Sequence, residues 1–205
     1  MAVDTSAAPS KRRSYARGRP CVFFDRDGII NRRPTSRYVE TVAAFELLPE
    51  FVDALRVVRQ RGYAAVVVTN QRGVERGCLT RATLAAIHRH LRRVLRQHGL
   101  TLDAIRVCTS LSDEHPDRKP NPGMLLKAAR QLDLDLSRSW MVGDQETDVE
   151  AGRRAGCQTI LVSAEADATA ADAHLRSMAE LPAWLRRRLR PARGSSSLGK
   201  SRAVC

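Results

Sequence analysis

The sequence has no long hydrophobic run. Its longest unbroken apolar segment is the six residues from Tyr63 to Val68, whereas a membrane-spanning helix needs about 20 residues. The basic N-terminal stretch is not followed by an apolar segment of about 7–15 residues, which a secretory signal contains. These absences argue against a membrane protein and a secreted protein, and we expect a cytoplasmic protein without a membrane partner.

The sequence also lacks closely spaced cysteine pairs. The five cysteines, at positions 21, 78, 108, 157 and 205, are odd in number and include no Cys-x-x-Cys pair. This pattern is typical of a reducing compartment, in which most thiols behave as small buried apolar groups.

Acidic residues are too few to balance the basic ones, and the net charge is +13. Residues 1–20 contribute +4 and residues 185–205 contribute +7, so the centre of the chain is nearly neutral. Because both ends are also rich in Ser, Ala, Gly and Pro, we expect disordered basic tails at 1–19 and 190–205 around one domain at 20–189. The tails could bind nucleic acid phosphates, but no aromatic stacking platform accompanies them, so we favour a solvated role.

The central part alternates short apolar runs with amphipathic segments, which indicates parallel strands joined by helices. We predict an α/β fold, a doubly wound, Rossmann-like parallel sheet of about five strands without a large cap domain. Strands are expected at 21–24, 64–68, 105–108, 140–142 and 159–162, and helices at 49–60, between Thr80 and Gly99, from Pro122, and at 146–155.

Polar residues stand where these predicted strands end, and the carboxyl ends of parallel strands meet at one crevice. Clustered carboxylates are usually held by a hard cation, for which Mg²⁺ is the economical choice. A metal, a lysine and a hydroxyl together suit a phosphoryl group. One carboxylate could then attack phosphorus while another transfers protons. The segments concerned are Asp25-Arg26-Asp27-Gly28, Thr69-Asn70-Gln71, Arg118-Lys119-Pro120 and Gly143-Asp144, with Asp148 one helical turn further on.

These four segments resemble, in order and position, the four motifs of the haloacid dehalogenase-like (HAD-like) phosphohydrolases. Their surroundings more narrowly resemble the D-glycero-D-manno-heptose 1,7-bisphosphate phosphatases and the related histidinol phosphatases, from about residue 21 to residue 163. The longer matches are Phe24 to Gly28 with Asn31, Val67 to Val74 with Arg76-Gly77, Arg118 to Pro120 with Pro122 to Leu125, and Met141 to Asp144.

The resemblance implies a Mg²⁺-dependent phosphatase that removes the 7-phosphate of a heptose bisphosphate through an aspartyl-phosphate. Asp25 would be the nucleophile and Asp27 the general acid and base. Mg²⁺ would bind Asp25, the main-chain carbonyl of Asp27, and Asp144. The remaining roles implied are phosphoryl stabilisation by Thr69 and Lys119, and substrate binding by Asn70, Gln71, Arg72 and Arg118.

The sequence departs from the family pattern in three places. Arg32 to Arg37 form a longer and more basic loop before Tyr38-Val39 than the family's short substrate loop. The zinc loop of many members is reduced to Cys108 and His115, so we expect no zinc, because a structural site needs four ligands. Gln145 replaces a basic residue that is common after Gly-Asp.

Two other enzyme functions and one non-enzymatic function stay open. The substrate could be histidinol phosphate or the 3′-phosphate of a polynucleotide, and the chain could be an inactive nucleic-acid-binding module. The four motifs retain every residue that the chemistry needs, which counts against an inactive binding module. Outside the site, Asp148 is expected behind the metal ligands or as a helix N-terminal acid, and the histidines at 88, 90 and 98 are expected on a solvated helix face.

Overall fold

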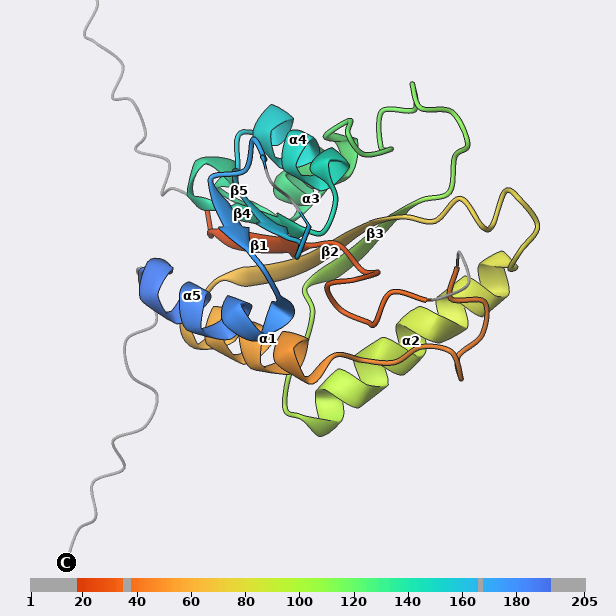
Figure 1. Ribbon diagram of the computed structural model, residues 1–205, viewed down its shortest axis with the longest axis horizontal. Helices are drawn as coiled ribbons and strands as arrows, with labels where there is room; N and C mark the ends of the chain where they lie inside the picture. The colour runs from red at the N-terminus through yellow and green to blue at the C-terminus, as the bar shows by residue number, and fades with distance from the viewer. Residues whose placement is uncertain (1–17, 35–37, 166–167, 193–205) are drawn as a thin grey trace, which may run out of the picture.

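The computed structural model describes residues 18–34, 38–165 and 168–192. Its centre is a parallel sheet of six strands in the order β3-β2-β1-β4-β5-β6 (Figure 1). The strands are β1 (Cys21–Phe24), β2 (Ala64–Asn70), β3 (Ala104–Cys108), β4 (Trp140–Gly143), β5 (Gln158–Val162) and β6 (Ala173–Leu175).

Helices cover both faces of the sheet, in a three-layer arrangement (Figure 1). Helices α3 and α4 lie on one face, and α1, α2 and α5 lie on the other. Their bounds are α1 (Pro49–Gln60), α2 (Arg81–Gln97), α3 (Gly123–Leu132), α4 (Glu146–Ala155) and α5 (Leu181–Arg188), with short 3₁₀ turns at Leu136–Arg138 and Met178–Glu180.

The local sequence accounts for these elements. All four residues of β1 are fully buried, as expected for an apolar strand with helices on both faces. Pro49 opens α1, where its missing N–H costs nothing. Thr80 caps α2 by accepting a hydrogen bond from the backbone N–H of Thr83 at 3.0 Å. The doubly wound α/β prediction is therefore confirmed, and all five predicted strands are present.

The sheet has one strand more than we predicted. Strand β6 pairs in parallel with β5 and places Ala173 opposite Ile160. It has only three residues, Ala-His-Leu, none of them β-branched, and so it carries little of the composition that marks a strand.

Most of the two predicted tails, residues 1–17 and 193–205, lies outside the described residues, and their disorder stays a prediction. Arg19, at the edge of the N-terminal tail, contacts the domain. Its backbone N–H donates to the carbonyl of Asp133 at 3.0 Å, and its guanidinium donates to the carbonyl of Tyr63 at 2.7 Å.

The described part of the chain contains no helix that is both long enough and apolar enough to span a bilayer. The cytoplasmic location stays a prediction from the sequence.

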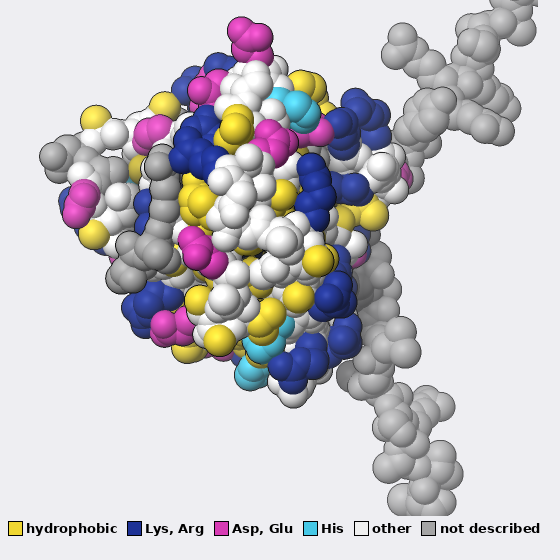
Figure 2. All heavy atoms as spheres, turned by 90° about the vertical axis from the view of Figure 1, so that its right-hand side faces the viewer, with side chains coloured by type: hydrophobic (Ala, Val, Ile, Leu, Met, Phe, Trp, Pro, Cys, Tyr) yellow, Lys and Arg dark blue, Asp and Glu magenta, His cyan; other side chains and the backbone are white. Residues whose placement is uncertain are grey.

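Basic charge is present within the domain as well as at its ends. Helix α2 contains five arginines and no acidic residue. The face of the molecule drawn in Figure 2 has groups of Lys and Arg side chains along its right-hand edge. A test for nucleic-acid binding therefore has to include the domain itself.

His88 corrects the expectation that all three α2-region histidines face solvent. Its ring is half-buried, and its Nε2 atom has no hydrogen-bond partner among the described residues. Burial, together with the nearby Arg26 charge, lowers the pKa of His88 from 6.5 to about 4.

His88 should therefore make folding stability depend on pH. The pKa of His88 is lower in the folded chain, so the unfolded chain binds this proton more readily. The contribution of neutral His88 to the free energy of unfolding is therefore complete above pH 6.5 and is lost as the pH falls through 4. We expect His88→Leu to flatten this dependence by on the order of 2–3 kcal/mol between pH 7 and pH 4. Urea unfolding at both pH values measures it, with His98→Leu, at an exposed position beyond the same helix, as the matched control. Equal pH dependence in wild type and His88→Leu would contradict the prediction.

Candidate active site

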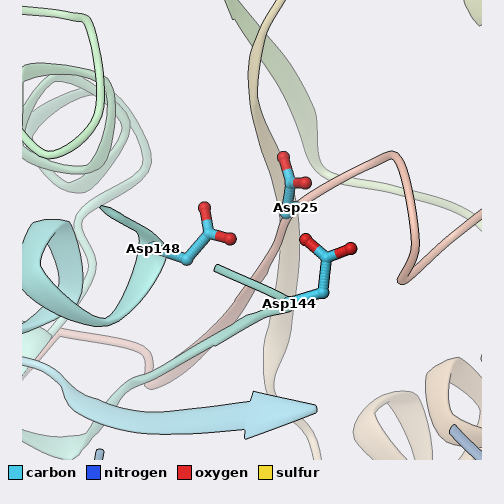
Figure 3. A group of neighbouring side chains, drawn as sticks. All are labelled: Asp25, Asp144 and Asp148. Carbon is cyan, nitrogen blue, oxygen red and sulfur yellow. The ribbon is translucent and has the colours of Figure 1, made fainter. Parts of the chain in front are cut away.

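Three carboxylates meet at the carboxyl edge of the sheet (Figure 3). Asp25 directly follows β1, Asp144 follows β4, and Asp148 lies in the first turn of α4. One oxygen from each lies within 4.8 Å of the others. The backbone N–H of Asp25 donates to the carbonyl of Val142 at 2.9 Å, which ties the end of β1 to β4 and brings these loops together.

Two glycines allow this close approach. A Cβ atom on Gly28, whose φ is +90°, would lie 1.9 Å from Oδ2 of Asp144. A Cβ atom on Gly143 would lie 2.1 Å from Cβ of Asp148. The glycines next to the motif acids therefore supply the space that these two carboxylates occupy.

Lys119 is buried between two of the acids. Its ammonium lies 2.6 Å from Oδ1 of Asp25 and 2.6 Å from Oδ1 of Asp148, and it donates to the carbonyl of Val68 at 2.9 Å. Burial alone would lower the pKa of Lys119, but the two carboxylates raise it well above its usual value. The side chain is therefore a fixed positive charge beside Asp25.

The carboxylates exceed the positive charge available to them. Burial, with the charge of Asp148, raises the pKa of Asp25 to about 7 against the opposing effect of Lys119, and the same causes raise the pKa of Asp144 to about 6. Oδ1 of Asp144 is buried without a partner among the described residues. Hard oxygen ligands in such excess fit a divalent cation such as Mg²⁺.

Asp27 has a different environment. Its carboxylate accepts hydrogen bonds from Arg26, from Asn31 at 3.0 Å and from Gln71 at 3.0 Å. Burial opposes ionisation, but Arg26 and these donors lower the pKa of Asp27 below its usual value. Asp27 is therefore ionised at neutral pH, which is the state of a base.

The pKa values of Asp25 and Asp27 are thus shifted in opposite directions, and both side chains face a pocket of about 350 Å³. Six predicted site residues line this pocket: Asp25, Asp27, Thr69, Asn70, Lys119 and Asp144. The hydroxyl of Thr69 accepts a hydrogen bond from the side-chain amide of Gln71 at 2.9 Å. Its own proton therefore stays available for an oxygen of a ligand.

The other predicted substrate residues have protein partners. Gln71 is buried and donates to Asp27 and Thr69. Arg72 and Arg118 both contact the carboxylate of Asp113, outside the pocket lining. Asn70 exchanges hydrogen bonds of 3.0 and 3.1 Å with the backbone of Lys119. Their contact with a substrate stays a prediction.

Cys108 and His115 lie together as a pair of candidate ligands, and the absence of zinc stays a prediction. Sγ of Cys108 is 3.6 Å from Nδ1 of His115, and the same nitrogen accepts the backbone N–H of Asp117 at 3.1 Å. Within the described ranges, the aspartate triad is the only group of three or more candidate ligands.

Two residues of the site were not among the predicted catalytic, substrate-binding or metal-binding residues, although Asp148 was expected behind the metal ligands or as a helix N-terminal acid. Asp148 is 2% exposed and pairs with Lys119, so it belongs to the site itself. Its position one turn after Gly143-Asp144, on the first turn of a predicted helix, was the available signal. Arg33 contacts Asp144 from the loop after β1, and no local pattern predicts that contact.

This chain is similar in sequence and in fold to known proteins. Residues 117–190 match the family model described as HAD-hydrolase-like. The D-glycero-beta-D-manno-heptose-1,7-bisphosphate 7-phosphatase of Mesorhizobium japonicum is 37% identical over 189 residues, covering 88% of this chain and 79% of that protein. The enzyme of the same name from Escherichia coli K12 is 35% identical over 196 residues, covering 86% and 99%.

A solved structure agrees with these relatives. The D,D-heptose 1,7-bisphosphate phosphatase from B. bronchiseptica, complexed with magnesium and phosphate, has 32% identity and a TM-score of 0.74, and the match covers 82% of this chain and 98% of that one. The fold and the four strand-end motifs define a HAD-like hydrolase. The chain belongs to the HAD-like phosphatases, which are phosphoric monoester hydrolases, in the group of the heptose bisphosphate phosphatases.

Proposed function

We propose that the protein is a Mg²⁺-dependent phosphatase that removes the 7-phosphate of D-glycero-D-manno-heptose 1,7-bisphosphate through an aspartyl-phosphate. The observation that carries the chemistry is the Asp25 carboxylate, held 2.6 Å from the buried Lys119 ammonium in a pocket that Thr69 also lines. A nucleophile next to a fixed cation and a hydroxyl donor can approach a phosphate dianion.

The residues divide the reaction into two displacements. An oxygen of Asp25 attacks phosphorus, the bond from phosphorus to the leaving oxygen breaks, and Asp27 gives that oxygen a proton. Water then attacks phosphorus while Asp27 takes its proton, the bond to Asp25 breaks, and inorganic phosphate leaves. Because Asp27 is ionised at neutral pH, it is ready for the second step and takes up a proton before the first.

Lys119 and Thr69 contribute by holding the transferring group. The Lys119 ammonium supplies positive charge, and the Thr69 hydroxyl, oriented by Gln71, donates its proton to a phosphoryl oxygen. Asp25, Asp144 and the backbone carbonyl of Asp27 would hold Mg²⁺, with Asp148 close by. When bound, Mg²⁺ supplies a Lewis acid that neutralises phosphate charge.

The names of the relatives support a sugar bisphosphate as substrate. Arg72 and Arg118 could meet its second phosphate if both release Asp113, whose side chain is 80% exposed. The alternative substrates are histidinol phosphate and the 3′-phosphate of a polynucleotide, because the short connection between Asp25 and β2 leaves no room for a large cap domain and an open crevice can admit a larger substrate.

A phosphate-release screen tests the substrate. We expect heptose 1,7-bisphosphate to give a kcat/KM at least about tenfold above that for histidinol phosphate, because only the bisphosphate offers a second dianion, worth roughly 1.4 kcal/mol or more in charge-assisted hydrogen bonds. Parallel assays use a 3′-phosphorylated oligonucleotide and a chelator in place of Mg²⁺. A higher kcat/KM for either alternative substrate would reassign the substrate. No release from any ester, p-nitrophenyl phosphate included, would favour an inactive binding module.

A further inference from the structure

Arg33 provides a positive charge at the candidate metal site. It lies in the loop after β1, and its Nε donates to Oδ2 of Asp144 at 3.1 Å, across 111 positions of sequence. A terminal nitrogen of the same guanidinium contacts the same oxygen. The Arg33 side chain is 55% exposed, whereas that of Asp144 is 11% exposed. A cation from the surface therefore covers a mostly buried acid.

The other cation of the pocket, Lys119, pairs with different carboxylates. Lys119 makes its ion pairs with Asp25 and Asp148, and in the described part of the chain the ion pair of Asp144 is with Arg33. The second oxygen of Asp144, Oδ1, is buried without a hydrogen-bond partner there. Arg33 is thus the cation paired with Asp144 in the described part of the chain.

A guanidinium and a divalent cation compete at such a carboxylate. Both use the oxygen lone pairs, and two positive groups a few ångströms apart repel each other. We propose that Arg33 is a resident counter-cation of Asp144 which Mg²⁺ has to displace, so that Arg33 lowers the affinity of the site for Mg²⁺. This inference rests on the proposed Mg²⁺ site and adds a residue that sets its affinity.

The surroundings of Arg33 allow it to leave. With Pro34 it lines the pocket, and its half-exposed side chain can reach water by rotating about its own bonds. Arg32 offers a matched control because it belongs to the same loop, is 66% exposed, and pairs with Glu46 rather than with the carboxylate triad.

Titration calorimetry of MgCl₂ into the metal-free protein tests the proposal. We expect Arg33→Gln to lower the Kd for Mg²⁺ by about three- to tenfold, the range for releasing one acid from a partly exposed ion pair. Arg32→Gln should leave the Kd within twofold. An unchanged or higher Kd in Arg33→Gln, while wild type binds Mg²⁺, would overturn the role of Arg33 alone. If wild type and both variants bind no Mg²⁺, the proposed metal site fails as well.

A second readout follows the side chain directly. The Nε–H signal of Arg33 in a ¹H–¹⁵N spectrum is identified by its loss in Arg33→Gln. We expect saturating Mg²⁺ to move this signal toward that of a solvated arginine and to increase its exchange with water. A signal unchanged by saturating Mg²⁺ would mean that Arg33 stays on Asp144, which contradicts displacement.

Discussion

Asp25→Asn is expected to lower phosphate release by at least about 10⁴-fold, because an amide oxygen does not replace the attacking carboxylate. The variant should still fold. Burial and Asp148 already oppose the charge of Asp25, and Lys119 keeps its ion pair with Asp148 and its hydrogen bond to Val68. Steady-state assays with Mg²⁺ measure the loss, and urea unfolding of the metal-free protein checks the fold.

Asp27→Asn is the matched control, since it changes the neighbouring acid in the same way. Loss of proton transfer lowers the rate by roughly 10²–10⁴-fold. With p-nitrophenyl phosphate, whose leaving group needs little protonation, the rate of the first displacement should fall less than the rate of the second. Phospho-enzyme should therefore accumulate in Asp27→Asn and be absent in Asp25→Asn. Turnover by Asp25→Asn at a rate near that of wild type would rule out Asp25 as the nucleophile.

Lys119→Met should damage both activity and folding. It removes a phosphoryl-binding cation, which costs about 10²–10³-fold in rate. It also leaves Asp25 and Asp148 buried beside each other without their shared cation, and breaking a buried pair in this way costs about 3–5 kcal/mol of unfolding free energy. Enzyme assays and urea unfolding at pH 7 measure the two effects.

The double variant Lys119→Met with Asp148→Asn separates these effects. Removing the second charge should restore part of the unfolding free energy, because one of the two uncompensated carboxylates is gone. The rate should stay low, since the cation is still missing. Recovery of activity together with stability would show that Lys119 acts through folding and does not bind the phosphoryl group.

The sheet could be predicted from the sequence because its central strands have a distinctive composition. Cys21–Phe24 and the run ending at Val68 are apolar on both faces, which is required of strands covered by helices on both sides. Capping by Thr80 and the opening of α1 by Pro49 are local rules that the structure obeys. Since parallel strands end at one edge, the meeting of Asp25, Thr69, Lys119 and Asp144 followed from the topology.

Contacts that long side chains make between distant segments could not be predicted in this way. The position of Asp148 was visible, but its pairing with Lys119 depends on how α4 packs against the loop before α3. Arg33 reaches Asp144 across 111 positions, and Arg72 and Arg118 meet at Asp113 in a loop without a periodic pattern. Such long side chains have many rotamers, so only the folded surroundings select one.

Chemical trapping of the aspartyl-phosphate tests the central claim most directly. The protein is quenched in acid during turnover with Mg²⁺, reduced with borohydride, and digested for peptide mass spectrometry, because borohydride converts an aspartyl-phosphate to homoserine. The mechanism predicts homoserine at position 25 only when substrate and Mg²⁺ are both present, with a higher yield in Asp27→Asn. Phosphate release without any modification at Asp25 in either protein, or homoserine at another aspartate, would contradict it.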